Sequence, residues 1–334
     1  MEVIEDESIA LIVTSPPYPM IEMWDQIFAK QNPEIQSILA QNNGMEAFEL
    51  MHLELDKVWQ ECNRVLIPGG FCCINIGDAT RTIDGNFALY SNHSRIIRAF
   101  SDLQFSNLPA VIWRKATNAP NKFMGSGMLP AGAYVTLEHE WILIFRKGNK
   151  RLLSSGEQIR RRESAFFWEE RNSWFSDIWE YQGTRQKINE LKDSRRSAAF
   201  PFEIPYRLIN MYSIKNDQVL DPFGGTGTTT LAAIASQRDS VMFDIDPEFI
   251  KLTYQRLNQY NPLIINEINS ERLSKHAKYI QNRIMEKGKE SIKYFNQFLD
   301  QPVVTNQETW LRLPFVQSIE PQDFGYLVEY AERG

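Results

Sequence analysis

The chain has 334 residues, of which 43% are hydrophobic and 12% aromatic, enough apolar material for one large or two modest packed domains. Its formal net charge is −6, and no stretch approaches the roughly 20 uninterrupted apolar residues of a membrane span. Residues 1–7 are acidic where a secretory signal would be basic, so we expect a cytoplasmic protein and no membrane partner.

The first half of the chain predicts strands that alternate with helices. An apolar strand over residues 9–13 leads directly into the polar segment 14–18. Leu50, Leu53, Val58 and Leu66 have helical spacing and predict a helix over 45–66, which Pro68-Gly69-Gly70 is expected to stop. The next expected elements are a strand over 71–76, a helix over 93–103, and strands over 108–113 and 141–145.

The second half continues this alternation. We expect a helix over 205–213, a strand at 219–220, a helix over 228–236 and a strand over 241–243. Such alternation favours an α/β fold with a largely parallel sheet between two helical layers. From about residue 252 the chain is expected to be mostly helical as far as Asp300 and to form an accessory extension.

Cysteines are few. Cys62, Cys72 and Cys73 lack the paired spacing of a zinc site and lie in or beside apolar runs. Buried thiols are therefore expected, with neither a disulfide nor a metal site.

Positive charge gathers in the middle of the chain. From Arg146 to Arg196 there are 13 Lys or Arg against 8 Asp or Glu, so the rest of the chain carries about 11 net negative charges. This segment also holds Trp168, Trp174 and Trp179, which is unlike a disordered linker. Its candidates for phosphate contacts are Arg160, Arg161 and Arg162, although a solvated charged face would look the same.

The run from Asp221 to Thr229 reads Asp-Pro-Phe-Gly-Gly-Thr-Gly-Thr-Thr. A strand that turns through glycines into a helix lets a ligand approach the backbone, and Asp244, at the next strand end, can hold a ribose. Tight strand-to-helix packing is the alternative reading. No Lys follows the last glycine, so the loop does not predict a triphosphate site.

The run Thr14-Ser15-Pro16-Pro17-Tyr18 stands at the end of the first strand. The exocyclic amine of a base is a poor nucleophile, because its lone pair is delocalised into the ring. The Ser15 hydroxyl and the Pro16 carbonyl can accept its two protons, the prolines fix the backbone, and the Tyr18 ring can stack on an extruded base. Taken alone, Ser-Pro-Pro-Tyr is most often a surface turn.

With these two motifs in this order, residues 3–255 resemble the β-group of bacterial DNA amino-methyltransferases. The resemblance implies a Rossmann-like fold, the cofactor S-adenosylmethionine and double-stranded DNA as substrate. The implied catalytic residues are Ser15, Pro16, Pro17 and Tyr18. The implied cofactor-binding residues are Asp221, Phe223, Gly225, Gly227, Asp244, Phe200 and Pro201. Lys115 is implied near the flipped base, and we group it with the arginines as DNA-binding.

The resemblance also implies a domain order. Residues 1–146 form the catalytic half, 147–196 a small target-recognition region, 197–255 the cofactor half and 256–334 a helical extension. The group contains restriction-modification enzymes and orphan modification enzymes, and in the first case a restriction endonuclease encoded nearby is the expected partner.

Ser15 is similar to the N4-cytosine enzymes of this group, whereas adenine-N6 relatives usually carry Asp or Asn there. The sequence therefore favours N4 methylation of cytosine, with adenine-N6 methylation as the alternative. Two departures from the group exist: Arg196 stands where relatives have His, and the Gly-Asp-type adenine segment expected before the first strand is missing. A catalytically idle DNA-binding protein is thus a third hypothesis.

Overall fold

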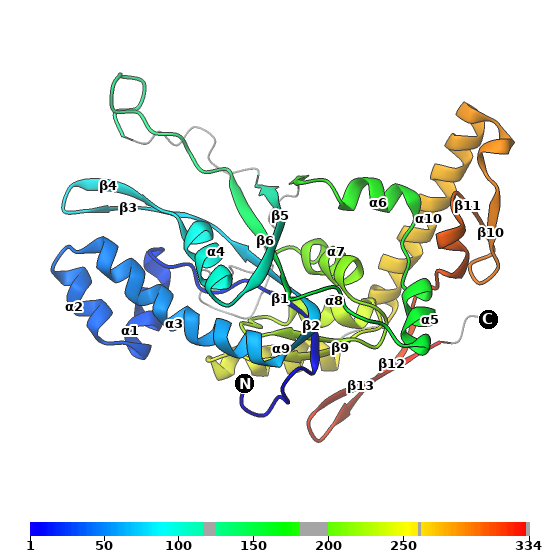
Figure 1. The fold of residues 1–334 in the computed structure, drawn as a ribbon, viewed down its shortest axis with the longest axis horizontal. Helices are drawn as coiled ribbons and strands as arrows, with labels where there is room; N and C mark the ends of the chain where they lie inside the picture. Colours follow the sequence, from blue (N-terminus) through cyan, green and yellow to red (C-terminus); the bar gives the residue numbers. More distant parts are fainter. Residues whose placement is uncertain (116–124, 181–199, 260–261, 332–334) are drawn as a thin grey trace.

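A seven-stranded sheet forms the centre of the molecule, in the order β7-β5-β6-β2-β1-β8-β9 (Figure 1). The computed structural model describes residues 1–115, 125–180, 200–259 and 262–331. Only β6 among these seven strands runs antiparallel to its neighbours, so the predicted mostly parallel sheet is confirmed. The strands are β1 (Ile9–Thr14), β2 (Leu66–Ile76), β5 (Phe105–Arg114), β6 (His139–Lys147), β7 (Ile178–Glu180), β8 (Gln218–Asp221) and β9 (Asp239–Met242).

Helices cover both faces of this sheet. One layer contains α1 (Asp25–Gln31), α2 (Glu34–Ala40), α3 (Gly44–Val65) and α4 (Asn92–Asp102); the other contains α7 (Glu203–Tyr212), α8 (Thr228–Ala235) and α10 (Pro262–Lys287). Ile12 packs into the first layer, and Leu11 and Val13 pack into the second. Because successive side chains of a strand point to opposite faces, a strand covered on both sides must be apolar throughout, as β1 is.

The helix α3 forms where predicted, but its buried face differs from the predicted one. Asn43 caps its start by accepting a hydrogen bond from the Glu46 amide. The core side is a stripe at intervals of three and four residues, whereas Leu53 is 50% exposed. The stripe consists of Phe48, Met51, Leu55, Trp59 and Cys62. All three cysteines are buried free thiols, as predicted.

Two local predictions were wrong. Pro68-Gly69-Gly70 does not stop α3, which ends at Val65; these residues belong to β2. A hairpin of β3 (Ala79–Ile83) and β4 (Asn86–Tyr90) was missed. Its turn is Asp84-Gly85, and both residues have positive φ, as a type I′ hairpin turn requires.

The basic middle region is built into the fold. It forms α5 (Ser155–Glu163), α6 (Trp168–Trp174) and β7, which pairs in parallel with β5. Trp174 and Trp179 are buried. Residues 181–196 of the predicted target-recognition region lie outside the described residues.

The C-terminal extension is helical only in its first part. After α9 (Pro247–Gln259), α10 ends at Lys287, and the expected helix as far as Asp300 is wrong beyond that point. Short hairpins and turns of 3-10 helix follow: η3 (Lys289–Ser291), β10 (Tyr294–Asn296), β11 (Gln301–Val303), η4 (Asn306–Trp310), β12 (Val316–Gln322) and β13 (Gly325–Tyr330). None of the described helices combines the length and the apolar character needed to span a membrane.

Ion pairs fasten this extension to α6. Arg272 donates to both carboxylate oxygens of Glu170, at 2.6 and 2.8 Å. His276 lies between the Glu169 carboxylate and the Pro302 carbonyl, and its ring stacks on Phe167. Glu169, His276 and Glu308 lie close enough together to be considered as metal ligands. Both ring nitrogens of His276 already have hydrogen-bond partners, so we assign the cluster a structural role in holding the extension against α6.

Candidate active site

The two predicted loops meet at the carboxyl edge of the sheet. Strands β1 and β8 are parallel neighbours, so their ends lie together. The Thr14 hydroxyl donates to Asp221 Oδ1 at 2.6 Å, and the Thr229 hydroxyl donates to Oδ2 at 2.6 Å. Asp221 is 2% exposed, and burial raises its pKa to about 6. Both carboxylate oxygens of Asp221, which was predicted as a cofactor ligand, are therefore engaged, and the hydrogen bond from Thr14 joins the two loops.

The glycine turn and Asp244 form a second fixed unit. Gly225 and Gly227 have φ of 51° and 74°, and a Cβ on Gly227 would lie 2.6 Å from Thr253. The Gly225 amide donates to Asp244 Oδ2 and the Asp246 amide to Oδ1, both at 2.8 Å. Burial raises the pKa of Asp244. A half-buried carboxylate of fixed orientation thus lies beside the glycine backbone.

The remaining predicted cofactor residues take part in packing. Phe223 is half-buried, and its ring centroid lies 6.0 Å from that of Trp59. Phe200 is buried in the core beneath α7, and the Pro201 carbonyl accepts from the Ile204 amide in the first turn of that helix. Arg196, which departs from the group pattern, lies outside the described residues.

The catalytic loop has its own hydrogen-bond network. The Tyr18 hydroxyl donates to Glu140 Oε2 at 2.9 Å and accepts from Asn75 Nδ2 at 2.8 Å. Ser15 Oγ lies 3.2 Å from the same hydroxyl. Burial, and then the charge of Glu140, raise the pKa of Tyr18 well above its ordinary value. Pro16 is buried and Pro17 half-buried on the same loop.

Asn75 and Glu140 are site residues that the sequence analysis missed. They are 3% and 9% exposed and hydrogen-bond each other at 2.7 Å. Lys115 forms an ion pair with Glu140 and lies 4.5 Å from the centroid of the Trp113 ring. Asn75 is a polar side chain inside the apolar run 71–76, and this departure from the apolar pattern could have identified it as a candidate site residue. The ion pair with Glu140 engages Lys115 in this structure, and its predicted role as a DNA contact stays a prediction.

The three predicted DNA-binding arginines lie away from this loop. They belong to α5, which follows β6 (Figure 1). Because β6 runs antiparallel to β1 and the strands parallel to it, β6 ends at the edge of the sheet where those strands begin. We call this edge the amino edge. Arg161 and Arg162 line a cavity together with Ala10 and Gly69, near the starts of β1 and β2. The Arg160 Nε atom is buried and has no hydrogen-bond partner among the described residues. The structure thus separates these arginines from the catalytic loop.

A glycine turn, an acidic residue after the next strand and a Ser-Pro-Pro-Tyr loop, joined by Asp221, define an α/β methyltransferase class. The family model described as DNA methylase matches residues 9–255. The chain therefore belongs to this N6/N4 DNA methylase family, and its predicted membership of the β-group amino-methyltransferases is confirmed.

Two type II methyltransferases are similar over most of the chain. Type II methyltransferase M.MthZI of Methanothermobacter thermautotrophicus is 49% identical over 94% of this chain and 87% of its own length. Type II methyltransferase M.MjaI of Methanocaldococcus jannaschii is 48% identical over 81% of this chain and 92% of its own.

Solved structures support the fold. A putative DNA modification methylase from Thermus thermophilus, solved in complex with S-adenosyl-L-methionine, is 30% identical, with a TM-score of 0.59 over 76% of this chain and 89% of that one. The PvuII DNA methyltransferase, described as cytosine-N4-specific, has a TM-score of 0.50 at 20% identity and covers 82% of this chain and 88% of its own, which shows the fold alone.

Proposed function

We propose that this chain transfers a methyl group from S-adenosylmethionine to the exocyclic N4 of a flipped-out cytosine in DNA. The observation that carries the proposal is the hydrogen-bond chain from Ser15 through Tyr18 to Glu140. This network orients the Ser15 hydroxyl hydrogen, so that Ser15 Oγ can accept a hydrogen bond from an amine.

Glu140 sets the direction of the hydrogen bonds in this network. The Tyr18 hydroxyl donates its single hydrogen to Glu140, so toward Ser15 it can only accept. Ser15 therefore donates its hydroxyl hydrogen to Tyr18. Its Oγ accepts one long contact from Asn75 Nδ2, at 3.5 Å, and keeps a lone pair for another donor. An exocyclic amine placed there donates one hydrogen to Ser15 Oγ and the other to the Pro16 carbonyl. These two contacts localise the nitrogen lone pair and aim it away from the loop.

The same edge of the sheet fits a nucleoside cofactor. A Cβ on Gly225 would meet only one atom within 4 Å, the Phe223 carbonyl at 3.9 Å, so the backbone there is open to a ligand. Asp244 would hold the ribose hydroxyls, and the adjacent Ile245, which is 69% exposed, offers an apolar surface to adenine. Bound S-adenosylmethionine supplies an electrophilic methyl group.

Ser15 supports cytosine as the target base. The Tyr18 ring packs on the backbone of Gly77, where a Cβ would lie 2.9 Å from it, so it offers a rigid face for an extruded base. The PvuII enzyme named as cytosine-N4-specific shares the fold. Since the two similar proteins are named type II methyltransferases, we propose that the chain works with a restriction endonuclease encoded nearby.

The test is a nucleoside analysis. The chain is expressed in cells that lack DNA modification, and their DNA is digested and measured by mass spectrometry for N4-methylcytosine and N6-methyladenine. Ser15→Ala is the inactive comparison and Ser8→Ala, on an exposed loop, the matched control. N4-methylcytosine from the wild type and the control confirms the proposal. N6-methyladenine refutes the choice of base. The absence of both modified nucleosides supports the idle DNA-binding hypothesis.

A further inference from the structure

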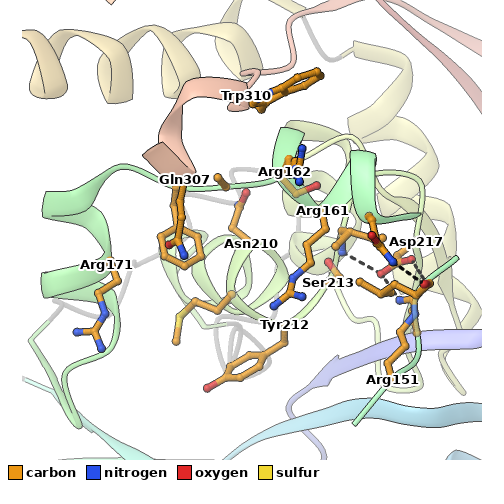
Figure 2. Close-up of a pocket in the computed structure, with 18 of the residues that line it drawn as sticks. Arg151, Arg161, Arg162, Arg171, Asn210, Tyr212, Ser213, Asp217, Gln307 and Trp310 are labelled. Carbon is orange, nitrogen blue, oxygen red and sulfur yellow. Dashed lines mark hydrogen bonds and ion pairs between the residues drawn. The ribbon is translucent and has the colours of Figure 1, made fainter. Parts of the chain in front are cut away.

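A second concave site lies at the amino edge of the sheet. It is a cavity of about 1270 Å³, and Figure 2 shows some of the side chains that surround it. Its walls come from α5, α6, the end of α7 and the 3-10 helix η4 of the C-terminal extension. Three segments that are distant in sequence thus build one site, and the extension supplies one of its walls.

The cavity is strongly cationic. Its described lining contains two carboxylates, Asp217 and Glu308, and six cations: Arg146, Lys150, Arg151, Arg161, Arg162 and Arg171. This excess of four positive charges belongs to a chain whose net charge is −6. A concave cluster of positive charge on an acidic protein concentrates anions.

Among the described residues, most of these cations have no acidic partner. Asp217 accepts two hydrogen bonds from Arg151, at 2.7 and 2.9 Å. Glu308 accepts from the Trp168 amide and caps η4 through Thr305. In the parts of the chain that the structure describes, no carboxylate pairs with Lys150, Arg161, Arg162 or Arg171. Their charges are available to a ligand.

Aromatic rings lie among these cations. Trp168 and Trp310 are 38% and 42% exposed, and Tyr212 also lines the cavity. The Arg162 guanidinium lies 6.0 Å from the centroid of the Trp310 ring. In Figure 2, Arg161 reaches toward Tyr212 from α5, and Gln307 lies on the opposite wall. Cationic grooves with accessible rings bind single-stranded nucleic acids, because the cations hold phosphates while the bases stack on the rings.

We propose that this cavity is a second nucleic-acid site, which binds a single-stranded polynucleotide by its phosphates and stacks its bases on Trp168 and Trp310. The concave shape favours a single strand, because a duplex is convex and keeps its bases inside. This site is separate from the methyl-transfer site, and its occupancy does not require methyl transfer.

The experiment measures fluorescence anisotropy of a labelled twelve-nucleotide oligothymidylate with the full chain over a series of salt concentrations. The double variant Arg161→Ala/Arg171→Ala is expected to bind at least tenfold more weakly and to flatten the slope of log K against log salt by about 1.4, or about 0.7 per lost phosphate contact. Trp310→Ala is expected to bind on the order of tenfold more weakly with the slope unchanged, since it removes stacking alone. Arg98→Ala, an exposed arginine of α4 at a distance from the cavity, is the matched control and is expected to bind like wild type.

Several outcomes would overturn this proposal. The first is that wild type does not bind the oligothymidylate. The second is that the double variant binds as well as Arg98→Ala does. The third is that thymidine monophosphate displaces the strand at equal phosphate concentration, which would indicate a small-anion site. Duplex methylation and the unfolding midpoint are measured on the same samples. We expect both to be unchanged, and a loss of methylation in the double variant would assign the cavity to the duplex site. Failure of wild type to methylate would refute the proposed function and leave the binding result interpretable.

Discussion

The two edges of the sheet hold their polar groups in opposite ways. At the carboxyl edge, the carboxylates already have partners: Lys115 and Tyr18 contact Glu140, and Thr14 and Thr229 contact Asp221. At the amino edge, Arg161 and Arg171 face a cavity without an acidic partner among the described residues.

This difference corresponds to two kinds of recognition. A reaction that depends on the direction of one lone pair needs acceptors held in place before the substrate arrives. A flexible polyanion needs several accessible charges and ring faces, and tolerates mobile side chains. Variants at the carboxyl edge should therefore affect rate and cofactor affinity, while variants at the amino edge should affect only stability or strand binding.

Glu140→Ala should have the largest effect. Without the carboxylate, Tyr18 is free to donate to Ser15, and Ser15 then presents its hydrogen to the amine. We expect kcat for DNA methylation to fall on the order of 100-fold, the cost of a misaligned reactive group, with KM for DNA little changed.

Glu140→Gln is the discriminating variant, because its amide oxygen can still accept from Tyr18. It should recover most of the rate. If both variants lost activity equally, the orientation of Ser15 would not be the reason for the loss, and the charge on Glu140 would be.

The buried Asp221 should make stability depend on pH. Its pKa of about 6 in the folded protein, against an ordinary 3.8, means that the folded state retains this proton over a range where the unfolded state has lost it. The stabilisation is complete below about pH 4 and is lost as the pH rises through 6. At about 1.4 kcal/mol per pKa unit, the difference in unfolding free energy between wild type and Asp221→Asn should shrink by about 2 to 3 kcal/mol from pH 4 to pH 7. Urea unfolding at several pH values measures it, and a constant difference would contradict the assignment.

The sequence predicted the carboxyl edge well because its signals are local. The apolar run that ends at Thr14 and the glycines after Asp221 each indicate a strand end, and parallel strands bring such ends together. Asp84-Gly85 was an equally local signal for the β3–β4 hairpin and was overlooked.

The amino-edge cavity could not be predicted in the same way. Arg161, Tyr212 and Trp310 lie about fifty to one hundred and fifty residues apart in the sequence, and no periodicity shows that they surround one space. The same limit applies to Asn75 and Glu140. Each is conspicuous as a polar residue in an apolar strand, but their contact follows only from the pairing of β2 with β6.

Asp244→Ala tests the cofactor part of the carboxyl edge. The lost carboxylate would remove charge-assisted hydrogen bonds to a ribose, which contribute about 1.5 to 3 kcal/mol. We expect Kd for S-adenosylmethionine to rise about 10- to 100-fold by isothermal titration calorimetry. Asp246→Ala, two residues further along, is the control and should bind with nearly wild-type affinity. Equal losses in both variants would indicate a disrupted turn.

The smallest effect is expected at the amino edge, from Arg151→Lys. Arg151 donates to both oxygens of Asp217, which is 5% exposed, and also to Glu157. Lysine keeps the charge but cannot form the paired contact, so the free energy of unfolding should fall by about 1 kcal/mol. Methylation should be unchanged, because Asp217 precedes β8 at the amino edge and the chemistry lies at its other end. A variant of normal stability and reduced kcat would show that the two edges are coupled through β8. It would contradict the independent roles assigned to the two edges.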